Sequence, residues 1–134
     1  MELTWDKRFE VRDDFIDAQH RMLVNIISRL AGLIEKKGSA EAVARVMHEI
    51  RKYAEFHFAS EECFMFEIGY PGLALHEAVH SKLLGELSVR IGRVIHHKAS
   101  GEEVLSYLYA WLAGHVEHED SKYMAYLRAH RQKS

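Results

Sequence analysis

The sequence has little of what several large classes of protein require. Its 134 residues include one cysteine, one proline and eight glycines, and no apolar run is long enough to span a bilayer. A lone cysteine, Cys63, excludes an intramolecular disulfide, and the charged N-terminus does not resemble a signal peptide. We therefore expect a cytoplasmic protein with no membrane insertion.

The sequence also has no excess of charge of either sign. Lys and Arg number 18 against 20 Asp and Glu, which gives a formal net charge of -2. A protein that binds phosphate backbones normally carries a clear basic excess, so nucleic acid is not an expected partner. The length fits one domain, and a hydrophobic fraction of 48% is enough for one core.

The spacing of apolar residues is helical throughout, which predicts an all-α protein. The expected helices run from Asp13 or Asp14 to Gly38, from Ser39 to the break at Gly69-Tyr70-Pro71-Gly72, from about Leu73 to Ala99, and from Ser100 into the high 120s. Four long helices joined by short turns must be antiparallel neighbours, so we expect an up-down-up-down four-helix bundle over residues 13–130. Residues 1–12 are left as an N-terminal arm.

Histidine is unusually abundant, with ten residues in the chain. Five of them fall on the apolar stripes of the four expected helices, together with one glutamate a turn after His57; the set is His20, His57, Glu61, His76, His80 and His115. The others fall at helix ends or on outward positions; we expect His48, His96, His97 and His130 to be solvated and His118 to lie at the surface.

Polar side chains on a core stripe must be satisfied or must hold a ligand. Each unsatisfied group would cost about 1–3 kcal/mol in a hydrocarbon core, and a metal removes that cost. Cys63 is not among the inward residues, which excludes iron–sulfur clusters and cysteine-rich zinc sites. Imidazole with carboxylate is a suitable donor set for iron, zinc, copper or manganese. Six donors exceed the four of a closed zinc site and favour two ions with a bridging carboxylate.

One local motif suggests a different function. The segment from His76 to His80 reads His-Glu-x-x-His, which is the zinc-binding helix of many metallopeptidases with Glu77 as general base. The extended metzincin motif fails because Leu83 stands where a glycine is required, and no strand is expected that could bind an extended peptide. A peptidase would also leave the inward residues of the other three helices unexplained, so we expect Glu77 to be solvated.

Several short motifs occur together, in order and with consistent gaps, from Trp5 to about Leu127. They are Ile16-Asp17-Ala18-Gln19-His20, His57-Phe58-Ala59-Ser60-Glu61-Glu62, Tyr70-Pro71, His76-x-x-x-His80 and Trp111-Leu112-x-x-His115-x-x-x-x-Asp120. In this combination the sequence resembles the bacterial hemerythrins, a family of four-helix bundles that bind dioxygen at a non-heme di-iron site.

The resemblance implies a ligand set and a function. One iron would take His76, His80 and His115, the other His20 and His57, and Glu61 and Asp120 would bridge them with an oxo or hydroxo group. The second iron then keeps an open position where dioxygen binds reversibly as the pair cycles between Fe2+ and Fe3+, which makes the protein a carrier and not an enzyme. The pocket lining implied by the resemblance is Leu23, Phe58, Trp111, Leu112 and Tyr123.

Helical spacing and the resemblance disagree about one ligand. Asp120 lies roughly 140° around an ideal helix from His115, whereas Glu119 lies only about 40° away. Spacing alone selects Glu119 and the family motif selects Asp120. We follow the motif and expect a local widening of the helix there, such as a π-bulge.

The physiological role stays open at this point. Oxygen storage, delivery to an oxygen-consuming enzyme, and sensing of oxygen or nitric oxide would all use the same ligands, and a di-iron oxidase or peroxidase is the alternative of a different class. Free-standing bacterial members of the family are often monomeric, so we expect a monomer.

Overall fold

The computed structural model describes residues 14–115 and 121–131, and these form five helices. They are α1 (Asp14–Glu35), α2 (Ala40–Glu67), α3 (Leu73–Ile95), α4 (Gly101–Gly114) and α5 (Ser121–Arg131). The predicted all-α fold is confirmed, with no strand among the described residues. The expected fourth helix corresponds to α4 and α5 together; residues 116–120 between them, and the predicted arm of residues 1–12, lie outside the description.

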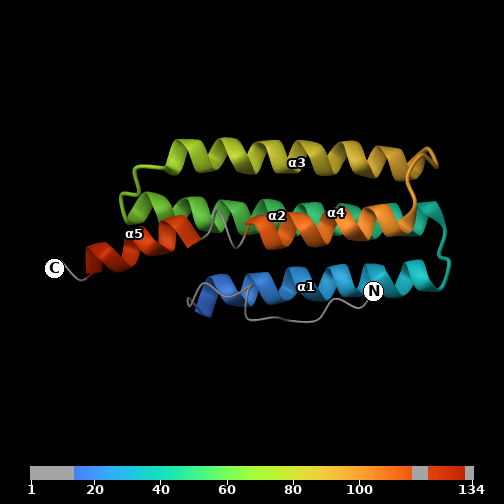
Figure 1. The fold of residues 1–134 in the computed structure, drawn as a ribbon, viewed down its shortest axis with the longest axis horizontal. Helices are drawn as coiled ribbons and strands as arrows, with labels where there is room; N and C mark the ends of the chain where they lie inside the picture. The colour runs from blue at the N-terminus through green and yellow to red at the C-terminus, as the bar shows by residue number, and fades with distance from the viewer. Residues whose placement is uncertain (1–13, 116–120, 132–134) are drawn as a thin grey trace.

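Serine side chains begin two of the helices as the sequence indicates. The Ser39 hydroxyl accepts a hydrogen bond from the backbone N–H of Ala42 at 3.1 Å, and the Ser100 hydroxyl accepts one from the N–H of Glu103 at 3.2 Å. Each hydroxyl satisfies an amide that has no partner within its own helix. The two caps fix where α2 and α4 begin, and both lie at the same end of the bundle (Figure 1).

The end of α1 differs from the prediction that Gly38 terminates it. The helix ends at Glu35, and the residue with a left-handed backbone is Lys37, with a φ of 59°. Gly38 instead allows the backbone to pass close to the Leu33 side chain, because a Cβ at this position would lie 2.5 Å from a methyl carbon of Leu33. Its N–H donates to the Leu33 carbonyl at 3.0 Å, which folds the chain back toward α2.

The helices α1 to α4 alternate in direction, as Figure 1 shows. Helix α2 packs against both α1 and α3, and α1 also packs against α4. The start of α1, the end of α2 and the start of α3 lie on the left in Figure 1, and α4 runs toward the same side and ends near the middle. Every inward histidine predicted from the sequence falls in one of these four segments.

The buried face of α2 is wider than the apolar stripe on which His57 and Glu61 lie. Tyr53 and Phe64, which belong to that stripe by helical spacing, are only half-buried, whereas Met47, Ala54 and Met65 are fully buried. The reason is that α2 is covered on two sides, by α1 and by α3, so side chains on two neighbouring stripes become inaccessible. The buried face of α2 also contains two polar residues, His57 and Glu61.

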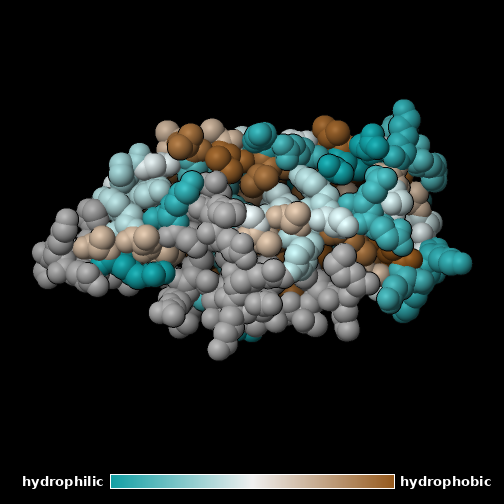
Figure 2. Space-filling model, viewed as in Figure 1, coloured by the Kyte–Doolittle hydropathy of each residue, from teal (hydrophilic) through white to brown (hydrophobic). Residues whose placement is uncertain are grey.

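The surface mixes hydrophilic and hydrophobic side chains. Figure 2 shows hydrophobic residues over the upper side of the molecule among hydrophilic ones, and the exposed apolar side chains of α3 include Leu75 and Val89. In the described ranges, no helix combines the length and the apolar character that a bilayer crossing requires.

Candidate metal centre

The six polar residues predicted to point inward are all buried. Their exposed fractions are at most 3%, for His20, His57, Glu61, His76, His80 and His115. The remaining histidines that the structure describes in full, His48, His96 and His97, are exposed as expected. The side chains of His118 and His130 lie outside the described part of the chain. Burial therefore separates the histidines into the two groups that the periodicity predicts.

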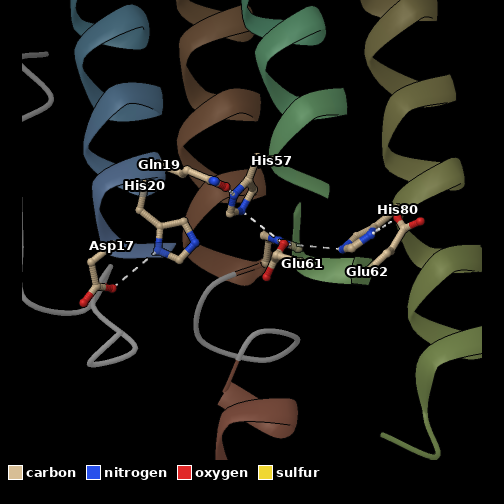
Figure 3. Close-up of polar contacts among 8 residues, drawn as sticks. Asp17, Gln19, His20, His57, Glu61, Glu62 and His80 are labelled. Carbon is tan, nitrogen blue, oxygen red and sulfur yellow. Dashed lines mark hydrogen bonds and ion pairs between the residues drawn. The ribbon is translucent and has the colours of Figure 1, made fainter. Parts of the chain in front are cut away.

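The Glu61 carboxylate lies at the centre of the buried cluster. Its Oε1 atom is 2.9 Å from Nε2 of His115, 3.1 Å from Nε2 of His57 and 3.6 Å from Nε2 of His80. These rings come from α4, α2 and α3, and Figure 3 shows Glu61 between His57 and His80, with His20 on the α1 side. One carboxylate oxygen thus faces imidazole nitrogens from three helices.

The donor atoms form two groups that share Glu61. His20, His57 and Glu61 offer three ligand atoms within 4.8 Å of one another, and so do Glu61, His80 and His115. His76 lies beside the second group, with its ring centroid 4.9 Å from that of His80 and 6.4 Å from that of His115. A carboxylate that belongs to two adjacent donor groups is placed to bridge two metal ions.

Two of the histidine rings form a hydrogen bond through Nδ1, the ring nitrogen that does not face Glu61, to a polar side chain. Nδ1 of His57 lies 2.7 Å from Oε1 of Gln19, and Nδ1 of His80 lies 2.8 Å from Oε2 of Glu62. An amide or carboxylate oxygen only accepts, so Nδ1–H is the donor in both contacts, and Nε2 is the ring nitrogen that remains for a metal ion. The pKa of Glu62 is raised above its ordinary value. Burial is the main cause and the Glu61 carboxylate adds to it, while the nearby His76 acts in the opposite direction.

The donor set fits metal ions. Nε2 of His57 and Nε2 of His80 lie near the same carboxylate oxygen in a buried site, and a cation between them would bind all three donors. Two donors bonded to one metal at about 2.1 Å and at a right angle lie about 3 Å apart, which is close to the separations of Glu61 Oε1 from His57 and His115. Cys63 is exposed, so the donors of the cluster are nitrogen and oxygen only.

Aromatic side chains cover the cluster. The ring of Phe58 stacks on that of His80 with centroids 4.0 Å apart and planes at 4°, and Trp111 stacks on His115 with centroids 6.2 Å apart. Phe58, Trp111, Leu23 and Leu112, four of the five residues predicted to line a pocket, are buried. The side chain of the fifth, Tyr123, lies outside the described part of the chain. The histidines beside these rings are at most 3% exposed.

The seventh predicted ligand lies outside the described residues. Asp120 and its alternative Glu119 both fall in the segment 116–120. At His115, the residue after α4, the backbone is right-handed helical with a φ of -60° and a ψ of -48°. The predicted widening of the helix beyond this residue falls in the segment 116–120 and stays a prediction.

Sequence reasoning did not assign roles to Gln19 and Glu62, which each lie next to a predicted ligand. Gln19 could have been found, because it lies three residues after Ile16 and four before Leu23 and therefore on the inward stripe of α1. Glu62 has no comparable signal, since it lies at the edge of the buried face of α2. Glu77 is exposed as expected, so the general base of a peptidase is not part of the buried cluster.

Comparisons with known proteins agree with this site. A family model described as the hemerythrin HHE cation binding domain matches residues 11–127. The chain is 30% identical to a bacteriohemerythrin of Stenotrophomonas maltophilia over 96% of this chain and 83% of that protein. It is 27% identical to a myohemerythrin of Riftia pachyptila, over 89% of this chain and 88% of that protein.

Solved structures of hemerythrin have a similar fold. A crystal structure of wild-type hemerythrin superimposes with a TM-score of 0.80 at 25% sequence identity, and the match covers 91% of this chain and 95% of that one. The match of the family model over most of the chain, together with the buried histidine and glutamate cluster, shows that this protein belongs to the hemerythrin family.

Proposed function

We propose that the protein holds two iron ions and uses them to bind dioxygen reversibly. The observation that carries the proposal is the Glu61 carboxylate, which is fully buried and shared by two groups of donor atoms. The proposed ligands are His76, His80 and His115 for one ion, His20 and His57 for the other, with Glu61 and Asp120 as bridges. Bound ferrous ions would supply an open coordination position and the electrons that dioxygen takes up on binding.

The donors of this chain suit a carrier better than an oxidising enzyme. The described donors are one carboxylate and four imidazoles, with the His76 ring beside them, so they bring little negative charge to the cluster. Di-iron enzymes of the ferritin-like type use mostly glutamate ligands, and anionic oxygen donors stabilise iron in high oxidation states. A site dominated by imidazole therefore favours release of dioxygen over further oxidation.

The apolar residues around the cluster support reversibility by excluding water. Phe58 lies against His80, and Trp111 lies against His115, so aromatic rings cover the histidines of two helices. A dry pocket withholds the protons that would drive bound oxygen to leave in reduced form. We assign this shielding role to Phe58, Trp111, Leu23 and Leu112 together.

Repeated oxygenation tests the function directly. The ferrous protein, prepared without oxygen, should gain a visible absorption band on exposure to air, lose it under vacuum and repeat the change over many cycles. His57→Ala should abolish the band, whereas the matched change His48→Ala on the exposed face of the same helix should leave it intact. Irreversible oxidation on first contact with oxygen, or steady consumption of ferrous iron or peroxide, would contradict the carrier and favour an enzyme.

A separate prediction concerns the ligand from the segment 116–120. If Asp120 bridges the ions, Asp120→Ala should lose iron or its bridged spectrum, while Glu119→Ala should keep both. The iron content of the two purified variants, measured side by side, decides the matter. Loss of iron only from Glu119→Ala would mean that simple helical spacing, and not the family motif, identifies the ligand.

A further inference from the structure

We propose that Gln19 and Glu62 are positioning residues that hold His57 and His80 for metal binding, and that the negative charge of Glu62 lowers the reduction potential of the ion that His80 binds. Each residue touches one ring, through the hydrogen bonds of 2.7 Å from His57 and 2.8 Å from His80. The inference rests on the proposed function, because it takes His57 and His80 as ligands of different ions.

The two hydrogen bonds share a pattern that runs across the bundle (Figure 3). Gln19 precedes the proposed ligand His20 on α1 and reaches a ring on α2; Glu62 follows Glu61 on α2 and reaches a ring on α3. Two successive helices thus each supply a proposed ligand and, in the adjacent residue, the support for a ring on the next helix. Each of the two donor groups contains one ring supported in this way.

These hydrogen bonds fix the tautomer and the orientation of the rings. With the proton of each imidazole held at Nδ1, Nε2 stays available to a metal without any rearrangement on binding. Gln19 is 3% exposed and His57 is fully buried, so few alternative partners from solvent compete for this ring. Loss of such a partner typically lowers metal affinity by about 10- to 100-fold.

The chemical difference between the two acceptors carries the second part of the proposal. A carboxylate draws the Nδ1 proton more strongly than an amide does and so gives the imidazole more anionic character, which stabilises a metal ion in its higher oxidation state. The negative charge of Glu62 should therefore make the ion bound by His80 easier to oxidise than it would be with an amide at this position.

Competition with a chelator tests the positioning role. Gln19→Ala and Glu62→Ala should each release metal at about 10- to 100-fold lower chelator concentration than the unmodified protein. Glu62→Gln, which keeps an oxygen acceptor, should restore most of the affinity. Alanine variants that hold metal as tightly as the unmodified protein would overturn the positioning role, and so would a Glu62→Gln variant that binds no better than Glu62→Ala.

The midpoint potential of the iron-loaded protein tests the charge difference. Glu62→Gln should raise the potential and Gln19→Glu should lower it, because the first removes and the second adds a negative charge next to a ligand ring. Glu67→Gln is the matched control. Glu67 lines the same surface groove as Glu62, and its substitution removes the same charge. Equal shifts in Glu62→Gln and Glu67→Gln would overturn the proposal, whereas an unmodified protein that binds no iron would overturn the proposed function itself.

Discussion

Removal of the two bound irons is expected to lower the melting temperature of the protein by about 30 °C. Each ion present at a thousandfold excess over its dissociation constant stabilises the native state by about 4 kcal/mol, because the unfolded chain has no assembled site. The described donors come from α1, α2, α3 and α4, so loss of the ions loosens all four helices at one end of the bundle. Calorimetry of the loaded and chelator-treated protein measures the difference.

The control for this result is iron added back to the chelator-treated protein. Restoration of the original melting temperature shows that the loss came from the metal and not from damage during treatment. An equal melting temperature for the two forms would contradict the account, because it would mean that contacts such as the 2.9 Å approach of His115 to Glu61 satisfy the buried cluster without a cation.

The second large effect is expected for Glu61→Ala, which should lose both ions. Glu61 is the residue common to the two donor groups, and its carboxylate is fully buried. Replacing one of the other donors, for example by His20→Ala, removes a ligand from one group only. We expect Glu61→Ala to reduce the affinity for iron by more than about a hundredfold. This exceeds the effect of losing a residue that only hydrogen-bonds to a ligand. The iron content after dialysis measures the loss.

Glu67→Ala is the matched control for that experiment. Glu67 lies on the same helix and is exposed, so its loss changes the charge of α2 without touching the cluster. Glu61→Gln preserves the size of the side chain and shows by circular dichroism whether the helices stay folded once the charge is gone. Two irons per chain in a folded Glu61→Ala protein would show that the carboxylate does not join the two sites.

The sequence predicts the inward histidines because two simple rules coincide at these positions. Helical periodicity places His57 and Glu61 one turn apart on an apolar face, and the cost of burying them unsatisfied indicates a ligand. The same periodicity does not show how far α2 is enclosed by its neighbours. Met47 and Ala54 are buried because α1 and α3 cover two sides of that helix, a fact of tertiary packing that no single stripe contains.

The supporting residues are harder to predict for a related reason. The contact between Glu62 and His80 joins two helices, and it depends on how α2 and α3 are rotated about their own axes and on the rotamers of both side chains. A residue at the edge of a buried face has no distinctive spacing, so its role becomes visible only when the helices are placed side by side. Gln19 differs, because its inward position follows from the spacing of α1 alone.

The metal content of the purified protein is the most direct test of the central claim. After expression with sufficient iron, elemental analysis should find two irons per chain, consistent with two donor groups that share Glu61. The same measurement on His57→Ala and on the exposed-site control His48→Ala should show loss of iron only in the first. One zinc per chain and no iron in the unmodified protein would contradict the di-iron site and the function built on it.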